Sequence, residues 1–118
     1  MTTQLSEGAV VFAHGTTELA LDLPGNPGVT VAPLLARDEG RTIDVFFLTL
    51  EPGAAVAREQ HPFSETLVPV SGTVACSVDD RPAVTVGAGQ VWHVEADRVH
   101  CVRNVGPTAA VLTMLIGV

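Results

Sequence analysis

Four side chains of the types that bind metal ions stand out in the sequence. Glu59, His61 and Glu65 fall in one short stretch, and His100 follows further along the chain. Two imidazoles and one carboxylate are the ligand types of non-haem iron and related divalent sites, and a second carboxylate accompanies them here. Two carboxylates that lie close together in a protein interior force one to stay protonated unless something neutralises them. A divalent cation is the simplest neutralising group.

The strands that carry these side chains must end at one place for the four to meet. Residues two apart in a strand point to the same side, so Glu59 and His61 are expected to point together. Pro62 ends this strand, Glu65 opens the next, and His100 opens a third. If the three strand ends lie inside a barrel, the four side chains converge on one point.

The composition favours strands of this kind. Valine and threonine are abundant, and branched side chains of this sort suit pleated, half-buried surfaces better than helices. Residues 20–28 read as a loop because they contain two prolines and two glycines. An edge strand is expected at 8–12, before this loop. The sequence predicts about nine short strands after it, at 29–37, 43–50, 55–60, 66–70, 73–78, 83–86, 90–94, 100–105 and 109–116. So many short strands in one domain indicate an all-β barrel or jelly roll.

Charge and missing residue types exclude several functions. The chain has 118 residues, enough for one domain, and its formal net charge is −7. An acidic protein is not attracted to nucleic acid or to an anionic membrane, so neither is expected as a partner. The sequence contains no lysine and no tyrosine, which excludes Schiff-base chemistry and any phenolic acid or base.

Several features favour the cytoplasm as the location. The N-terminal residues have no basic start and no apolar signal core, and the apolar run at 109–118 is too short to cross a membrane. Cys76 and Cys101 provide no disulfide framework and are expected to be free thiols.

The spacing around the first three candidate ligands resembles the first motif of the cupin superfamily. That motif runs Gly, five residues, His-x-His, three or four residues, Glu, six residues, Gly. Here Gly53 is followed by five residues, Glu59, one residue and His61, and then by three residues, Glu65, six residues and Gly72. Every interval fits, and Glu59 stands where the family usually has its first histidine.

A second stretch resembles the second cupin motif. Gly89, His100 and Asn104 hold their places in it, whereas Glu95 and Asp97 stand where proline and glycine are usual. The two motifs, at 53–72 and 89–104, imply a double-stranded β-helix, which is a small jelly-roll barrel with the metal near its centre. The resemblance is to small, single-domain bacterial cupins, so one domain over residues 1–118 is expected. The changed residues before His100 are expected to alter a turn only.

The resemblance implies a metal site formed by Glu59, His61, Glu65 and His100. Glu59 allows three interpretations. It could ligate and give a two-histidine, two-carboxylate site suited to Fe, Mn, Ni or Zn. It could stand beside a three-ligand metal and act as a catalytic base. The site could also be degenerate and empty.

Other residues carry weaker signals. Trp92 and His93 point to opposite sides, and the tryptophan is expected to be the inward one. Phe46 and Phe47 likewise divide between the interior and the outside. Phe63 lies between two candidate ligands and could cover the mouth of the site. Asn104 is expected to hold a turn or to orient a ligand. Arg98 is expected to lie on the surface, and Cys101 is expected to point away from the metal.

The leading hypothesis is a metalloenzyme with one divalent transition metal. Its substrate would be a small, largely apolar or aromatic molecule that bears oxygen. Its reaction would be of the dioxygenase or isomerase/cyclase type. The alternative is a non-catalytic cupin that binds or senses a small ligand or a metal. A barrel without a site is a third possibility. The apolar C-terminal strand and the N-terminal segment further favour a homodimer.

Overall fold

The computed structural model describes residues 3–6, 8–14, 20–38 and 40–117. Within these residues it contains strands and no helix, so no helix there could cross a membrane. The strands are β1 (Thr3–Ser6), β2 (Ala9–Phe12), β3 (Leu21–Asp22), β4 (Val29–Leu35), β5 (Ile43–Leu50), β6 (Ala55–Glu59), β7 (Ser64–Ser71), β8 (Thr73–Val78), β9 (Val84–Gly87), β10 (Trp92–Val94), β11 (His100–Asn104) and β12 (Ala110–Gly117).

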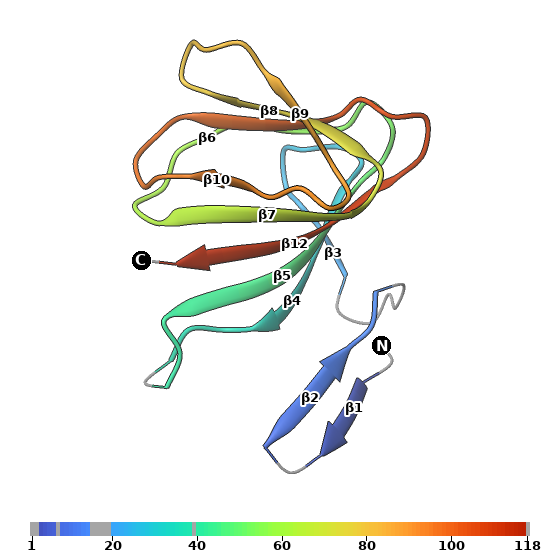
Figure 1. The fold of residues 1–118 in the computed structure, drawn as a ribbon, viewed down its shortest axis with the longest axis vertical. Coiled ribbons are helices and arrows are strands. Elements are labelled where there is room, and N and C mark those ends of the chain that lie inside the picture. The colour runs from blue at the N-terminus through green and yellow to red at the C-terminus, as the bar shows by residue number, and fades with distance from the viewer. Residues whose placement is uncertain (1–2, 7, 15–19, 39, 118) are drawn as a thin grey trace.

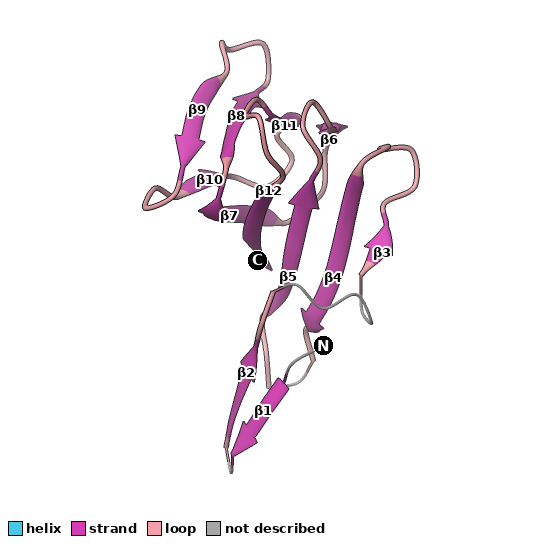
Figure 2. Ribbon diagram, turned by 90° about the vertical axis from the view of Figure 1, so that its right-hand side faces the viewer, coloured by secondary structure: helices cyan, strands magenta, loops and turns pink. Residues whose placement is uncertain are grey.

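Two antiparallel sheets face each other across the core (Figure 1). The larger sheet has the order β10-β7-β12-β5-β4-β3, and the smaller has the order β6-β11-β8-β9. Strands β1 and β2 form a separate hairpin that stands away from both sheets (Figure 2). This arrangement confirms the all-β, jelly-roll prediction, whereas the prediction of a single domain over residues 1–118 stays a prediction.

Alternation along the strands fills the core and also places polar residues in it. Along β7, Leu67 is buried in phase with Glu65, and along β11, Val102 is buried in phase with His100 and Asn104. Polar residues therefore occupy core positions, where burial is costly unless partners satisfy them. The rest of the core is aliphatic apart from a cysteine and a methionine, and comprises Val29, Leu48, Leu50, Val56, Val74, Cys76, Val86, Ala110, Leu112 and Met114.

The strand prediction was incomplete at the N-terminal side. Strand β3 lies inside the stretch 20–28 that was expected to be a loop, with Leu21 opposite Val31 and Asp22 opposite Thr30. The prolines and glycines begin only at Pro24, so the two preceding residues are free to pair. Strand β1 was not expected either, because its four residues show no apolar alternation. The expected edge strand at 8–12 is present as β2.

A bulge in β6 changes which residues face the interior. Val56 lies opposite Val102 and Glu59 opposite His100, so one extra residue of β6 is accommodated between these pairs. Arg58 takes a left-handed backbone conformation there, with φ of 50°. Without the bulge, simple alternation would turn Glu59 away from the face that carries Val56. The bulge brings both to the inside, as β-bulges often do beside functional sites.

The turns at 51–54, 71–73 and 104–108 lie together at one end of the barrel, here called the turn end. The buried Asn104 holds them, since its side-chain amide donates to the carbonyls of Leu50 and Thr108 and accepts from the N–H of Gly106. Gly72 has φ of 82°, and a Cβ there would lie 2.8 Å from the Cα of Ala110. Of the two roles expected for Asn104, these hydrogen bonds show the one of holding a turn.

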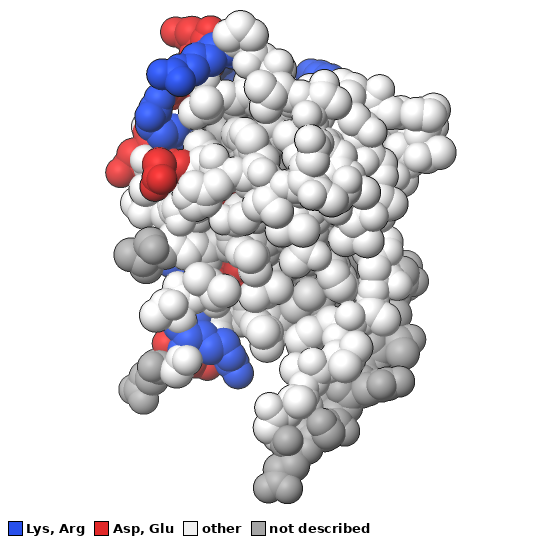
Figure 3. Space-filling model, in the orientation of Figure 1, with Lys and Arg blue, Asp and Glu red and all other residues white. Residues whose placement is uncertain are grey.

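The outward side of the larger sheet, here called the outer face, carries no charged side chain along its central strands. Six residues of these strands point outward with half-buried side chains, and the pairing of adjacent strands places them in rows. They are Ala32, Val45, Phe47, Val68, Thr113 and Leu115. In Figure 3, most charged side chains gather at the left-hand edge of the view, a few more show at the top and as a small acidic spot near the middle, and the rest of the described surface on this side is uncharged.

Candidate metal centre

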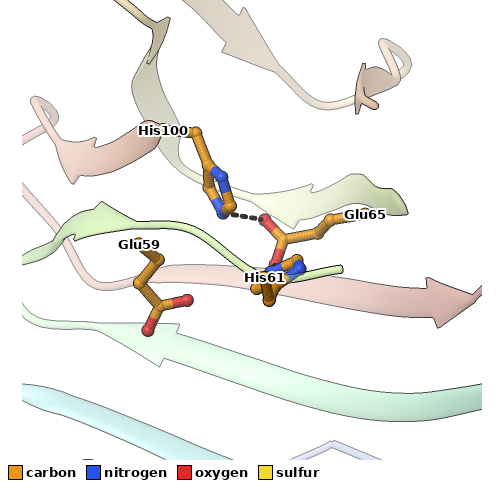
Figure 4. A group of neighbouring side chains, drawn as sticks. All are labelled: Glu59, His61, Glu65 and His100. Atoms are coloured by element: carbon orange, nitrogen blue, oxygen red, sulfur yellow. Dashed lines mark ion pairs between the residues drawn. The ribbon is translucent and has the colours of Figure 1, made fainter. Parts of the chain in front are cut away.

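The four predicted ligands come together at the barrel end opposite the turn end, here called the site end. Glu59 ends β6, His61 follows it in the loop, Glu65 lies on β7 and His100 opens β11 (Figure 4). One ligand atom from each residue lies within 4.8 Å of those of the other three. Such a group could hold a metal ion.

Backbone carbonyls fix the orientation of both imidazoles. The Nδ1 of His61 lies 2.9 Å from the carbonyl of Phe63, and the Nδ1 of His100 lies 3.1 Å from that of Arg98. A carbonyl only accepts, so each Nδ1 carries the hydrogen and each Nε2 keeps a free lone pair. Both Nε2 atoms are buried and have no hydrogen-bond partner within the described structure. Metal-binding histidines are held in this way.

Glu65 lies between the two imidazoles. Its carboxylate oxygens are 3.5 Å from the Nε2 of His61 and 3.4 Å from the Nε2 of His100. Burial alone would lower the pKa of His100, but the Glu65 carboxylate and the Arg98 carbonyl outweigh burial, and the pKa is raised. The cluster thus favours a positive charge at its centre, and its donors fit a divalent ion.

Glu59 differs from Glu65 and His100 in its surroundings. It is half-buried, whereas Glu65 and His100 are buried. In Figure 4 its carboxylate lies to one side of the pair formed by Glu65 and His100. It also faces a cavity of about 220 Å³ between the two sheets. The cavity is lined by Leu23, Val31, Phe46, Leu48, Val56, Glu59, Glu65, Val102, Met114 and Ile116.

Hydrogen bonds join the two loops that supply the histidines. The side-chain amide of Gln60 donates to the carbonyl of Asp97 at 2.9 Å, and the N–H of Asp97 donates to the carbonyl of His61 at 2.9 Å. Asp97 has φ of 65°, the conformation that a glycine would take at this position. Asp97 therefore takes the conformation of the usual glycine, although the changed residues were expected to alter this turn.

A second contact supports the loop before His100. Arg98 is paired with the carboxylate of Asp79, and the N–H of Asp79 donates to the carbonyl of Val99 at 2.7 Å. The Arg98 hydrogen bond lowers the pKa of Asp79. Arg98 lies on the surface, as expected, and anchors the loop there.

Arg37 and Asp44 support the loop that carries His61, and no pattern in the sequence marks either residue. The Arg37 guanidinium lies 3.7 Å from the centre of the Phe63 ring, and its Nε is 2.9 Å from the Asp44 carboxylate. Phe63 in turn offers its carbonyl to His61. The two charged residues belong to β5 and to the segment after β4, so only the folded sheet brings them to Phe63.

The remaining aromatic predictions are resolved by burial. Trp92 packs against the core, with its ring centre 6.2 Å from that of His100, while His93 is exposed. Phe46 lines the cavity, and Phe47 lies on the outer face. Trp92 and Phe46 are therefore the inward residues of their pairs. The expected choice of tryptophan over histidine is confirmed.

Both cysteines are free thiols, as expected. Cys76 is buried in the core, where burial and the nearby Glu65 raise its pKa to about 12. Cys101 is half-buried and lies on the side of β11 opposite to His100. A thiol with so high a pKa is a poor metal ligand and nucleophile, which leaves the cluster to histidine and glutamate.

Comparison with known proteins identifies the family. The family model of the cupin domain (Cupin_2) matches residues 46–116, a span that includes both motifs. A search of curated proteins found no match.

Solved structures support this assignment. The cupin domain of an XRE-family transcriptional regulator from Enterobacter cloacae is 26% identical, with a TM-score of 0.67, over 77% of this chain and 97% of that one. A predicted oxalate decarboxylase from Thermotoga maritima is 20% identical, with a TM-score of 0.75, over 91% and 99%. An oxalate oxidase is 19% identical, with a TM-score of 0.67, over 87% and 54%. By the family match and by its fold, this chain belongs to the cupin family.

Proposed function

We propose that this cupin is a metalloenzyme. In this proposal His61, Glu65 and His100 hold one divalent transition metal, Fe, Mn, Ni or Zn, and Glu59 is a fourth ligand or a general base. The observation that carries the proposal is the pair of buried Nε2 lone pairs that face the two oxygens of Glu65. Two imidazoles and carboxylates form a common ligand set for such ions.

The cavity beside the cluster supports a small substrate that is largely apolar or aromatic and bears oxygen. Its walls are apolar apart from Glu59 and Glu65, and such walls bind apolar surface and exclude water. A bound divalent ion supplies Lewis-acid polarisation of a substrate oxygen. If Glu59 is free, its carboxylate accepts a proton from substrate in the cavity. Dioxygenase or isomerase/cyclase chemistry fits these parts, and the oxalate-oxidising and predicted oxalate-decarboxylating neighbours are enzymes of the same fold.

The alternative proposal is a non-catalytic cupin that binds or senses a small ligand or a metal. It is favoured by the scarcity of acid–base groups, because Glu59 and Glu65 are the titratable residues lining the cavity. If both ligate a metal, no separate proton acceptor remains there. The role of Glu59 therefore decides between enzyme and binding protein.

Elemental analysis of tag-free protein tests the site. We expect about one equivalent of Fe, Mn, Ni or Zn in the parent and a loss of metal in His61→Ala. The matched control is His93→Ala, which removes an exposed histidine and should keep the metal. In Glu59→Ala, metal loss would identify a ligand, whereas retained metal would identify a base or a bystander.

The outcomes separate the proposals. A parent protein that holds no metal even after reconstitution would overturn the metalloenzyme. A metal-loaded protein that turns over a small ketone, enol or phenol would overturn the binding protein. Inertness of that loaded protein toward oxygen and toward keto–enol substrates would favour binding.

We further propose that two copies associate through the outer face. Each copy has a net charge of −7, so like charges oppose association wherever charged surfaces meet. The central strands of the outer face carry no charge, which makes it suited to a second copy. The β1–β2 hairpin stands apart from the sheets with Val10 and Val11 exposed, and isolated hairpins are marginally stable in water.

Light scattering coupled to size exclusion measures this association. We expect a dimer for the parent and a monomer for Val68→Glu, which places a charge on the outer face. Val84→Glu adds the same charge at an exposed position on β9 and should remain dimeric. A monomeric parent at micromolar concentration would overturn the dimer.

The cytoplasmic location is also a proposal. It is supported by the two free thiols, because disulfides are rare in reducing compartments. Fractionation of cells that express the full chain tests it. Recovery of the protein outside the cytoplasmic fraction would contradict it.

A further inference from the structure

The charged groups that line the cavity are all acidic. Glu59 and Glu65 face it, and the other lining residues are apolar. The sequence contains no lysine, and its six arginines all lie within the described structure, where none lines the cavity. A substrate in the cavity therefore meets no cationic side chain.

The arginines are committed elsewhere. Arg37 pairs with Asp44, and Arg98 pairs with Asp79. The other arginines are exposed, and they are Arg41, Arg58, Arg81 and Arg103. A substrate carboxylate in the cavity would have to rely on the metal alone for its countercharge.

The charges of the cluster determine what the metal could offer. The hydrogen bonds from Nδ1 to backbone carbonyls leave each Nε2 as the ligating atom, and an imidazole that ligates through Nε2 is neutral, so the histidines add no charge to a metal site. The two carboxylates add two negative charges, which a divalent ion balances. In an apolar cavity an additional unbalanced charge is costly, so an anion is disfavoured there.

We propose that Glu59 makes the site selective for uncharged oxygen donors, such as ketones and protonated phenols or enols, and excludes carboxylates. The inference rests on the proposed metal site and adds the class of substrate. A neutral residue in place of Glu59 would leave the loaded site with one positive charge. Glu59 is thus a specificity-determining residue.

Glu59, and not Glu65, is suited to this role. Glu65 lies between the two imidazoles and belongs to the centre of the cluster. Glu59 is half-buried, lies to one side and reaches the cavity only because of the bulge at Arg58. Its charge can therefore be removed while the two histidines and Glu65 remain in place.

Cobalt(II) is a suitable probe, since its visible absorption reports both metal binding and added ligands. Cobalt affinity is measured first for the parent and for Glu59→Gln. Each loaded protein is then titrated with acetate, as the anion, and with imidazole, as the neutral donor. Glu51→Gln is the matched control, because it removes the same charge at an exposed position outside the cavity.

We expect acetate to bind Glu59→Gln at least about tenfold more tightly than the parent, because the loaded variant gains a positive charge in a poorly screened cavity. Imidazole should bind both proteins about equally, and Glu51→Gln should behave like the parent. Equal acetate affinity in the cobalt-loaded parent and Glu59→Gln would overturn the inference while leaving the metal site standing.

Failure of the proposed metal site would give a different result from failure of the selectivity. A parent protein that binds no cobalt removes the metal site itself. If only Glu59→Gln loses cobalt, Glu59→His restores a neutral ligand and should bind acetate more tightly than the parent. If Glu59→Gln and Glu59→His both fail to bind cobalt, Glu59 serves metal affinity alone, and the proposed selectivity against carboxylates is overturned.

Discussion

The turn end and the site end of the barrel meet the same backbone requirement with different residues. At the turn end, positive φ angles belong to glycines, with 79° at Gly53 and 82° at Gly72. Beside the site, they belong to residues with side chains, with 50° at Arg58, 52° at Asp79 and 65° at Asp97. A residue other than glycine pays about 1 kcal/mol for this conformation.

The difference shows what each end is for. Glycine gives the turn end its tight packing and carries no further chemistry. At the site end the side chain of Asp79 pairs with Arg98, and the bulge at Arg58 aims Glu59 into the cavity. We therefore expect changes at the turn end to alter stability without loss of metal, and loss of metal to follow only from changes at the site end.

The largest expected loss of stability comes from Gly72→Ala. Its Cβ would lie 2.8 Å from the Cα of Ala110, and its φ is positive, so we expect a loss of about 3 kcal/mol. Denaturant unfolding measures it. Gly53→Ala is the control, because its φ is 79° but nothing lies within 4 Å of the added Cβ, and we expect about 1 kcal/mol. Equal losses in the two variants would show that packing at Gly72 is unimportant.

Asn104→Ala should cost somewhat less. It removes three hydrogen bonds and leaves buried backbone groups without partners, for which we expect about 2 kcal/mol in the free energy of unfolding. The metal content per folded molecule should stay unchanged. A variant that keeps its stability but loses metal would break the division between the two ends.

Asp97→Gly should have a smaller effect of opposite sign. Glycine adopts the φ of 65° without strain, so we expect a gain of up to about 1 kcal/mol, reduced by the entropy of the more flexible unfolded chain. The N–H donated to His61 remains, so metal affinity should be kept. A loss of metal affinity would show that the Asp97 side chain takes part in the site.

Asp79→Asn should give the smallest effect, and one that depends on pH. Arg98 lowers the pKa of Asp79 below 3.8 in the folded protein, so the pair stabilises the fold above that pH. The contribution is lost as pH falls through the folded pKa. Parent and variant should therefore differ at neutral pH and converge in acid, in unfolding curves recorded across pH. A difference that persists in acid would rule out the ion pair as its source.

The sequence was sufficient to predict the barrel and the members of the cluster. Spacing identified Glu59, His61, Glu65 and His100, and all four lie together in the structure. Such spacing can be recognised from sequence because each motif lies within a short stretch of the chain, in its own strands and turn. Simple alternation along β7 and β11 then predicts which of their side chains are buried.

The supports of the cluster could not be predicted in this way. Arg37 and Asp44 reach Phe63 across strands that are distant in sequence, and no local pattern marks them. The bulge at Arg58 was also missed, because the usual signal is a glycine in this conformation. Strand β3 is too short for its two residues to show a periodic pattern.

The extra residue in β6 has a consequence for how this chain could diverge. Deleting one residue beside Arg58 would place Glu59 two residues after Val56 and restore regular pairing with β11, so both side chains would still face the cavity. Val56 and the histidines on the neighbouring elements would keep their places. The loss of a single codon could thus remove the left-handed backbone conformation at Arg58 while the pocket and the barrel stay the same, a route that substitution alone does not offer.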